Sequence, residues 1–327
     1  MNIKEIARRA GVSRATVSRY LNDGYVSKEK RELIGRIIEE TGYVPSQSGQ
    51  QLRTGKTHLV GVIMPKINSQ SVSRMVAGIT SVLAQNNYQV VLANTENHEN
   101  REVEYLSLFS GRNRVDGIIL IATVFTEAHI SQIKRLNVPL VVLGQRLDGY
   151  PCVYQDDYHA LYDITRLVLP KAKQPAFLGV LEDDVSAGNE RHRGFLDACE
   201  SMGFSPSPEA QQVVDFDADA GYFGAERVLD AIPNVDTIVC ATDDIAFGAM
   251  MCMREYGRRI PEDVQITGVG DSLLSRIIHP SLTTVHLPFM TSGMEAANLL
   301  LQTMDASSQE PREVRMGYDV FGRNSMR

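Results

Sequence analysis

Cysteine is scarce in this chain, and long hydrophobic runs are absent. The 327 residues include four cysteines, and no two of them form a CxxC pair. We therefore expect buried free thiols, with neither a disulfide framework nor a zinc site. No apolar run approaches the roughly 18 residues of a membrane-spanning helix, and the N-terminus has no apolar signal region. These absences predict a cytoplasmic protein that makes no membrane contact.

The motifs of common enzyme classes are also absent. The sequence contains neither a GxSxG nucleophile motif nor an HExxH zinc motif. Residues 54–57 look like the end of a phosphate-binding loop, but Gln50 stands where that loop requires glycine. The paired aspartates at 156–157, 183–184 and 243–244 are sequence neighbours, whose side chains rarely face one another. We therefore expect no catalytic residue, no metal site and no cofactor.

The charge of the chain is divided unevenly. Its net charge is −7, but the first 58 residues carry +5 and the remainder carries −12. Lys and Arg side chains neutralise nucleic-acid phosphates, whereas an acidic surface repels them. A basic head on an acidic body therefore predicts that only the head touches nucleic acid.

The basic head begins with the pattern of a helix-turn-helix. Ile6 lies on an apolar helical face, Gly11 provides the left-handed backbone of a tight turn, and Ser13 is suited to cap a second helix. Val17 and Leu21, four residues apart, point inward from that helix. Its other face is small, polar and basic, which suits the major groove of DNA. The alternative is an ordinary helical hairpin with a solvated charged face.

The exposed face of this second helix predicts two kinds of DNA contact. Arg14 and Arg19 can each bind guanine through two hydrogen bonds, and Ala15 can contact a thymine methyl group. The other polar residues are expected to hold phosphates or to orient their neighbours. They are Ser13, Thr16, Ser18 and Asn22.

Three segments follow from the residue pattern. Residues 1–45 form a three-helix headpiece, in which Ser27 can cap the third helix and Gly42 ends it. Residues 46–57 form a polar linker, and residues 58–327 form an α/β core. In the core, strands and helices alternate in two series, which predicts two lobes with doubly wound parallel sheets and a ligand cleft at the carboxyl ends of the strands.

The element boundaries of the core are read from its hydrophobic pattern. The first series has strands at 59–64, 89–93, 117–122 and 140–143, with helices at 72–85, 99–112 and 126–136. The second has strands at 176–180, 237–241 and 264–268, with helices at 189–202, 220–231 and 244–256. Residues 283–287 and 314–320 are expected to cross back between the lobes.

The run from Ile3 to Asn22 resembles the N-terminal signature of the lactose-repressor (LacI/GalR) family of bacterial transcription regulators, and the likeness extends over nearly the whole chain. It implies an all-α DNA-binding headpiece and a core like the periplasmic sugar-binding proteins. The linker would be a hinge that becomes helical on DNA and places Leu52 in the minor groove. Gly49 replaces a common alanine, which costs about 1 kcal/mol of helix stability, so we expect a looser hinge in the free protein.

The resemblance also assigns residues to an effector pocket. Asn68 and Arg146 follow the first and fourth strands of the core, and Arg191 matches the arginine of an Arg-x-x-Gly-Phe motif that holds the effector. Thr242 stands where the family often has a ligand-binding asparagine. Asp271 lies in the segment that matches the family's Gly-Phe-Asp-Asp motif.

Two features of this pocket bear on the ligand. The phenylalanine that stacks on the ligand in many family members is missing from the loop after the first strand, and Gly270 replaces a common sugar-binding aspartate. Two arginines with one fewer carboxylate favour a disaccharide or a sugar phosphate. A purine or nucleoside effector is the alternative.

The resemblance implies a repressor of a carbohydrate-utilisation operon that binds a pseudo-palindromic operator as a homodimer. The chain ends without a leucine-heptad tail, which favours a dimer over a tetramer. The sequence leaves open whether the effector releases or recruits DNA. Two other interpretations are a module that delivers sugar to a transporter and a sugar-active enzyme. The basic headpiece opposes the first, and the missing catalytic motifs oppose the second.

Overall fold

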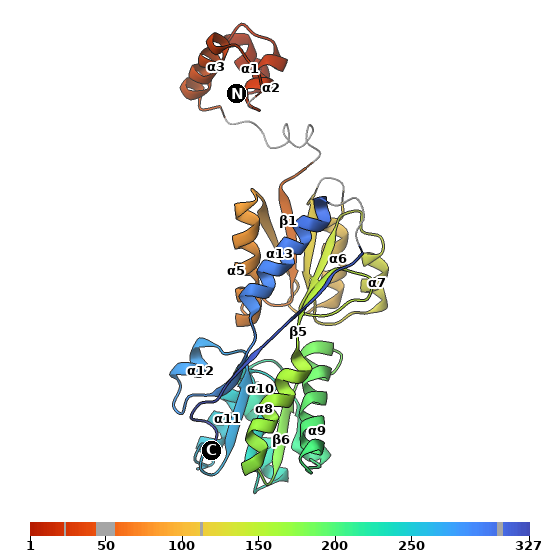
Figure 1. The fold of residues 1–327 in the computed structure, drawn as a ribbon, viewed down its shortest axis with the longest axis vertical. Coiled ribbons are helices and arrows are strands. Elements are labelled where there is room, and N and C mark those ends of the chain that lie inside the picture. The colour runs from red at the N-terminus through yellow and green to blue at the C-terminus, as the bar shows by residue number, and fades with distance from the viewer. Residues whose placement is uncertain (23, 44–55, 112–113, 306–309) are drawn as a thin grey trace. The chain divides into compact units, whose positions relative to one another are not determined.

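The computed structural model describes residues 1–22, 24–43, 56–111, 114–305 and 310–327 (Figure 1). The described residues between Met1 and His58 form one compact unit, and most of those from Leu59 to Arg327 form a second. The first unit is entirely helical, whereas the second alternates strands and helices. Leu52 lies outside the described residues, so its placement in the minor groove stays a prediction.

The helical unit contains the predicted helix-turn-helix. Its helices are α1 (Ile3–Arg9), α2 (Arg14–Tyr20) and α3 (Lys28–Thr41). They enclose a small apolar core that includes the fully buried Ile6, Val17 and Ile34.

The turns and ends of these helices follow from the local sequence. Gly11 has a φ of +59°, so the turn between α1 and α2 uses the left-handed backbone that glycine adopts without strain. The Ser13 hydroxyl accepts a 3.2 Å hydrogen bond from the Thr16 amide and caps α2. Gly42, with a φ of +58°, ends α3. Ser27 occupies the N-cap position of α3, but its side chain forms no capping hydrogen bond.

The larger unit has two lobes, each built on a six-stranded sheet. In the first sheet the strand order is β11-β5-β4-β3-β1-β2, and neighbouring strands run parallel. The strands are β1 (Leu59–Met64), β2 (Gln89–Asn94), β3 (Gly117–Ile121), β4 (Leu140–Leu143), β5 (Cys152–Gln155) and β11 (Glu313–Met316). The helices of this lobe are α5 (Gln70–Gln85), α6 (Glu99–Phe109), α7 (Glu127–Ile133) and α13 (Phe289–Asp305).

The second lobe repeats the same topology. Its strand order is β12-β10-β9-β8-β6-β7, and β12 is antiparallel to β10. The strands are β6 (Pro175–Gly179), β7 (Gln211–Val213), β8 (Thr237–Cys240), β9 (Gln265–Val269), β10 (Thr283–His286) and β12 (Asp319–Phe321). The helices are α8 (Asp157–Val168), α9 (Arg191–Ser201), α10 (Ala218–Ala231), α11 (Asp243–Glu255) and α12 (Leu273–Ile277), with short turns at η1 (Leu169–Lys171), η2 (Val185–Glu190) and η3 (Pro208–Ala210).

Both faces of the first sheet are buried, which explains its continuous apolar strands. Along β1, Val62 packs in the core on one face and Ile63 in the core on the other. Along β3, Ile119 and Ile118 divide in the same way. Parallel strands covered by helices on both sides have no solvent face, so their sequences lack a polar alternation.

Several boundaries differ from the sequence-based expectation. The expected helix at 189–202 begins at Arg191, because residues Val185–Glu190 form a π-helical turn. The segment at 314–320, expected to cross between the lobes, contains most of β11 and the start of β12, which belong to different sheets. The short strands β5 and β7 and the helices α8, α12 and α13 had not been predicted.

The lobes are joined by crossing segments rather than by a single linker. In the described part of the chain the backbone passes between the sheets at residue 156, at residues 287–288 and at residues 317–318. Figure 1 shows α13 beside α5 in the first lobe, although α13 follows strand β10 of the second lobe. The two expected return segments, at 283–287 and 314–320, thus lie beside two of these crossings.

All four cysteines are buried and free. They lie in apolar surroundings, and burial raises the pKa of the Cys199 thiol to about 12. Within the described residues, the helices are too short or too polar to cross a membrane.

Candidate functional site

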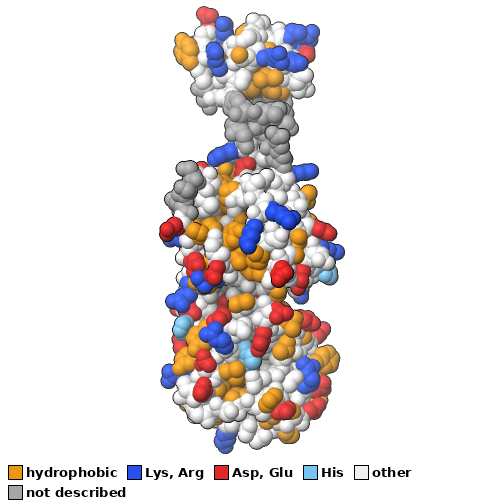
Figure 2. All heavy atoms as spheres, turned by 90° about the vertical axis from the view of Figure 1, so that its right-hand side faces the viewer, with side chains coloured by type: hydrophobic (Ala, Val, Ile, Leu, Met, Phe, Trp, Pro, Cys, Tyr) orange, Lys and Arg blue, Asp and Glu red, His pale blue; other side chains and the backbone are white. Residues whose placement is uncertain are grey.

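The helical unit presents the second helix of its helix-turn-helix to solvent. Arg14, Ala15 and Arg19 are exposed, whereas Thr16 and Ser18 are half-buried. Figure 2 shows Lys and Arg side chains over the face of this unit that is turned to the viewer. An exposed small residue between two exposed arginines leaves room for a helix to approach base edges closely.

The smaller polar residues of this helix are engaged in local hydrogen bonds. The Ser13 and Thr16 hydroxyls lie 3.0 Å apart, and the Asn22 amide donates to the Ser18 carbonyl. These bonds stabilise both ends of α2. The arrangement agrees with an orienting role for these residues. Arg14 and Arg19 are the long, exposed side chains of this helix that could extend to a partner.

The larger unit holds a cavity of about 350 Å³ between its two lobes. Its walls come from the segments that follow β1, β3, β4 and β5 in the first lobe, and β6, β7, β8 and β9 in the second. Ligands of doubly wound sheets bind in the crevice outside the carboxyl ends of the strands, where the connecting loops meet. Of the residues expected in the pocket, the lining includes Asn68, Arg191 and Thr242.

Arg191 is held in place from two sides at the base of the second lobe. It is 6% exposed, and its Nε donates a 2.8 Å hydrogen bond to Asp157 Oδ1. Its Nη1 donates to the Ala241 carbonyl. The guanidinium is therefore compensated by a carboxylate before any ligand arrives, and its planar edge is fixed towards the cavity that it lines.

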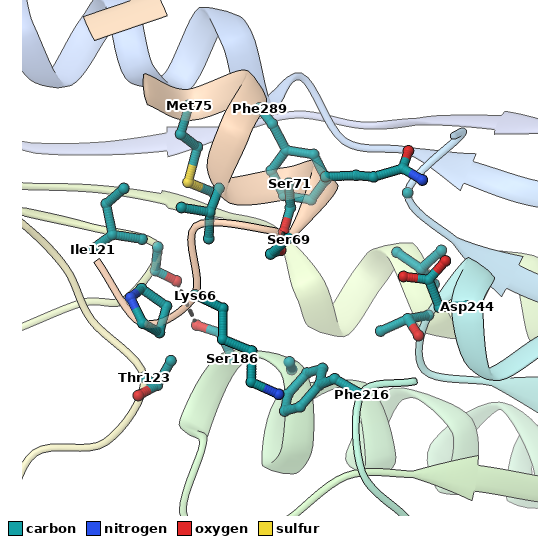
Figure 3. Close-up of a pocket in the computed structure, with 18 of the residues that line it drawn as sticks. Lys66, Ser69, Ser71, Met75, Ile121, Thr123, Ser186, Phe216, Asp244 and Phe289 are labelled. Atoms are coloured by element: carbon teal, nitrogen blue, oxygen red, sulfur yellow. Dashed lines mark hydrogen bonds between the residues drawn. The ribbon is translucent and has the colours of Figure 1, made fainter. Parts of the chain in front are cut away.

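The π-helical turn after β6 contributes a second wall. Asp184 caps this turn by accepting a 2.9 Å hydrogen bond from the Ala187 amide. Burial raises the pKa of the Asp184 carboxyl to about 6. The turn also contacts the first lobe, because Ser186 Oγ donates a 2.8 Å hydrogen bond to the Gly144 carbonyl (Figure 3).

The start of α11 forms a third wall. Thr242 Oγ1 accepts a 3.2 Å hydrogen bond from the Ile245 amide and caps the helix. Asp243 is 3% exposed and accepts a 2.7 Å hydrogen bond from the Ser272 amide. Burial raises its pKa. Asp244 also lines the cavity and points into it in Figure 3, and burial together with the charge of Asp243 raises its pKa.

Arg146 lies outside the cavity lining, contrary to the expectation that it shares the pocket with Arg191. Its side chain is 55% exposed and forms ion pairs with Glu313 at 2.8 Å and with Asp148 at 3.0 Å. The side-chain hydrogen bond with Glu313, followed by the charge of Asp148, raises the pKa of Arg146. Gly144, directly after β4, lines the cavity, whereas Arg146 two residues later does not, so position along the sequence alone did not place this side chain.

Asp271 also lies outside the lining, although its neighbours Gly270 and Ser272 belong to it. Its buried carboxylate forms ion pairs with Arg276 and Arg323 and a 3.1 Å hydrogen bond with His286 Nδ1. Burial raises the pKa of Asp271, but the hydrogen bonds from the two arginines outweigh burial and hold the pKa below its ordinary value. This aspartate ties the loop after β9 to α12 and to the C-terminal strand region.

The structure adds lining residues that the sequence had not indicated. Phe216 and Phe289 supply aromatic surface, and Figure 3 shows the Lys66 side chain pointing towards Phe216. The expected loss of an aromatic face is thus offset by rings from other segments. Gln155, at the end of β5, is a further buried lining residue. Its polarity at the end of an otherwise apolar strand was the one signal available in the sequence.

The described residues contain no group of three or more His, Cys, Asp or Glu side chains that could hold a metal ion. The cavity carboxylates are instead distributed over separate segments. They accept hydrogen bonds from backbone amides, as in Asp184 and Asp243, or pair with an arginine, as in Asp157.

Comparison with known proteins agrees with this geometry. Residues 2–46 match the family described as bacterial regulatory proteins of the lacI family. Residues 57–324 match the family of periplasmic binding proteins and sugar-binding domains of the LacI family. The chain belongs to the LacI family of bacterial transcriptional regulators.

Individual relatives span almost the whole chain. The sucrose operon repressor of Staphylococcus xylosus is 33% identical over 95% of this chain and 96% of its own. The HTH-type transcriptional repressor PurR of Erwinia tasmaniensis is 28% identical over 99% of this chain and 96% of its own. The solved structure of the transcriptional regulator CelR in complex with cellobiose is 27% identical, with a TM-score of 0.76 over 99% of each chain.

Proposed function

We propose that this LacI-family protein represses a carbohydrate-utilisation operon in the bacterial cytoplasm and that a small sugar in the interlobe cavity controls its grip on operator DNA. The observation that carries the proposal is the presence, in one chain, of an exposed basic recognition helix and of a cavity lined by both lobes. The headpiece would comprise residues 1–45, the hinge residues 46–57 and the effector-binding core residues 58–327.

A neutral sugar fits the cavity better than an anionic one. Five aspartates line it, against Lys66, Arg74 and Arg191. Arg191 is already paired with Asp157, and Arg74 donates to the Gly270 carbonyl at 2.9 Å. A carboxylate accepts hydrogen bonds, so this wall calls for hydroxyl donors and repels phosphate. The geometry therefore favours a neutral sugar, such as a disaccharide, over the sugar phosphate that the sequence also suggested.

Both lobes contact one another at the rim of the cavity, and this supports control by closure. Arg74 on α5 donates to Gly270 of the second lobe, and Ser186 of the second lobe donates to Gly144 of the first. A ligand that bridges the lobes would stabilise this closed arrangement over an open one. Such a difference in affinity between two states is what allows a small molecule to shift DNA binding.

A homodimer follows from the DNA geometry, since two headpieces can read two half-sites of a pseudo-palindromic operator. A candidate interface is α12, where Leu273 is 70% exposed and Ile277 is 66% exposed. These residues are four apart, so they share one face of the helix. A second copy of the chain would remove that apolar face from water.

The test is a DNA footprint on genomic promoter fragments with and without sugars. We expect protection of a pseudo-palindromic site whose strength changes when the effector is added. Release of DNA identifies an inducer, and stronger protection identifies a corepressor. A protein that binds sugar but protects no DNA would instead be a sugar-binding module, and a response to purines alone would contradict the sugar proposal.

A further inference from the structure

Gln155 has an unusual environment. The residue is 5% exposed, yet within the described part of the protein neither its amide nitrogen nor its amide oxygen has a hydrogen-bond partner. It is the last residue of β5 and lines the interlobe cavity. A buried polar group without a partner destabilises the fold, so an amide left in this state at a cavity wall calls for an explanation.

The other buried glutamines among the described residues form hydrogen bonds through their amides. Gln265 is fully buried and donates at 2.9 Å to the Val168 carbonyl, while its oxygen accepts from the Arg327 amide at 3.3 Å. Gln145 is 2% exposed and donates to the Thr123 carbonyl. The fold therefore satisfies glutamine side chains where they serve structure, and Gln155 departs from that pattern at the cavity.

We infer that Gln155 is a specificity-determining residue that recognises a hydroxyl of a neutral sugar through its amide. This inference rests on the proposed function and names the group by which the ligand is selected. A hydroxyl donates one hydrogen bond and accepts others, so one hydroxyl or a neighbouring pair can satisfy both amide atoms. The oxygens of an ionised phosphate only accept, so a phosphate placed at this amide would leave Oε1 of Gln155 without a donor.

Gln155 lies directly before one of the segments that cross between the two lobes. The chain passes from the first lobe to the second at residue 156, directly after Gln155. Asp157 begins the second lobe, lines the same cavity and holds Arg191. A sugar bound by Gln155 and by Arg191 would contact both sides of this crossing. The recognised hydroxyl would therefore lie beside the segment that joins the two lobes.

The experiment compares the full-length protein with Gln155→Leu, which removes both polar atoms at similar volume, and with Gln155→Met, which keeps the unbranched shape. Thr267→Val is the matched control, because the Thr267 hydroxyl is also buried without a partner among the described residues but does not line the cavity. Calorimetric titration uses sucrose, cellobiose, maltose and trehalose, sugar 6-phosphates, and hypoxanthine and guanine. Melting temperatures are measured without ligand.

We expect the wild-type protein to bind a neutral sugar more tightly than its phosphate ester. Both Gln155 variants should bind that sugar at least about tenfold more weakly, as expected for lost buried hydrogen bonds, and should keep operator affinity without sugar. Their melting temperatures should equal or exceed that of the wild type, since an unsatisfied amide has been removed. The control should bind sugar and DNA as the wild type does.

Three results would overturn the inference while leaving the proposed function intact. The first is unchanged sugar affinity in both Gln155 variants of a protein that binds sugar and operator. The second is a preference of the wild type for the phosphate ester. The third is a marked loss of melting temperature in both variants, because the amide would then serve the fold. Failure of the wild type to bind both sugar and DNA would instead contradict the proposed function.

Discussion

Ser186 Oγ donates a 2.8 Å hydrogen bond to the Gly144 carbonyl, and this bond joins the two lobes across the cavity that both residues line. Ser186 belongs to the π-helical turn after β6, whereas Gly144 follows β4 of the first sheet. The bond requires the two lobes to lie together as they do here. Its removal therefore tests whether the effector binds to this arrangement of the lobes.

Removal of this bond should weaken sugar binding. The Ser186→Ala variant loses a hydrogen bond of about 1 kcal/mol net, which corresponds to a roughly fivefold loss of sugar affinity if closure accompanies binding. Calorimetry on the full-length protein measures it. Ser201→Ala is the control, because the Ser201 hydroxyl donates within its own helix, to the Ala198 carbonyl at 2.8 Å. Equal losses of sugar affinity in the two variants would show that the Ser186 bond has no specific part in closure.

Arg19 should read a base rather than a phosphate. The Arg19→Ala variant is expected to lose about 1–3 kcal/mol on the preferred operator and to lose its preference at one base position. Binding to a set of single-base operator variants measures both effects. Arg36→Ala, which removes the same charge from an exposed position on α3, should weaken all sequences equally or not at all. A uniform loss for Arg19→Ala would assign Arg19 to the phosphate backbone.

Asp184 should make the stability of the core depend on pH. Burial raises the pKa of its carboxyl from 3.8 to about 6 in the folded protein. A raised folded pKa means that the contribution to stability is fully present below about pH 3.8 and is lost as the pH rises through about 6. At about 1.4 kcal/mol per pKa unit, the cost above that pH is on the order of 3 kcal/mol.

The Asp184→Asn variant tests this dependence, because asparagine can still accept the hydrogen bond from the Ala187 amide but does not ionise. Without ligand, its melting temperature should exceed that of the wild type at pH 7.5, and the difference should shrink towards zero near pH 4. Thermal unfolding of both proteins across that range measures the difference. A gap that stays constant with pH would contradict a raised pKa for Asp184.

The helix pair α5 and α13 should not tolerate a side chain at its crossing. A Cβ on Gly293 would lie 2.0 Å from the Met75 carbonyl oxygen, and one on Gly78 would lie 2.0 Å from the Met290 carbonyl oxygen. Gly293→Ala should therefore push the helices apart and cost about 1–3 kcal/mol of unfolding free energy. Gly317→Ala is the control, since no atom of the described residues lies within 4 Å of its Cβ position. Equal melting temperatures for the two variants would contradict the tight crossing.

Local sequence rules were sufficient for the headpiece. Gly11, Ser13 and Gly42 each have a role that depends only on near neighbours, and the structure places them as a turn, a cap and a helix end. The alternation of strands and helices likewise predicted the two parallel lobes. These features could be predicted because the signals that specify them lie within a few residues of one another.

The short connecting elements of the core could not be predicted in the same way. Strand β5 has only four residues, and it is buried because it lies between β4 and β11. Strand β11 is far from β5 in the sequence. Strands β11 and β12 follow each other closely, yet they complete different sheets. Such pairings depend on the tertiary arrangement, which leaves no periodic signal in the strand itself.

The cavity was predicted in part for a similar reason. Arg191 and Thr242 line the cavity because each lies on a segment that follows the carboxyl end of a strand in the second sheet. Arg146 follows a strand too, but Glu313 from the distant strand β11 pairs with it outside the cavity. Asp271 is likewise drawn to Arg323 near the C-terminus. Ion pairs between segments far apart in sequence decided both placements.

The central claim is that sugar in the interlobe cavity controls the DNA affinity of the headpiece. The most direct measurement is the affinity of the full-length protein for its footprinted operator, titrated with and without saturating neutral sugar. We expect a change of at least about fivefold, the lower limit of typical allosteric coupling, and no change for a variant that has lost sugar binding. Equal operator affinity with the cavity demonstrably filled by sugar would contradict it.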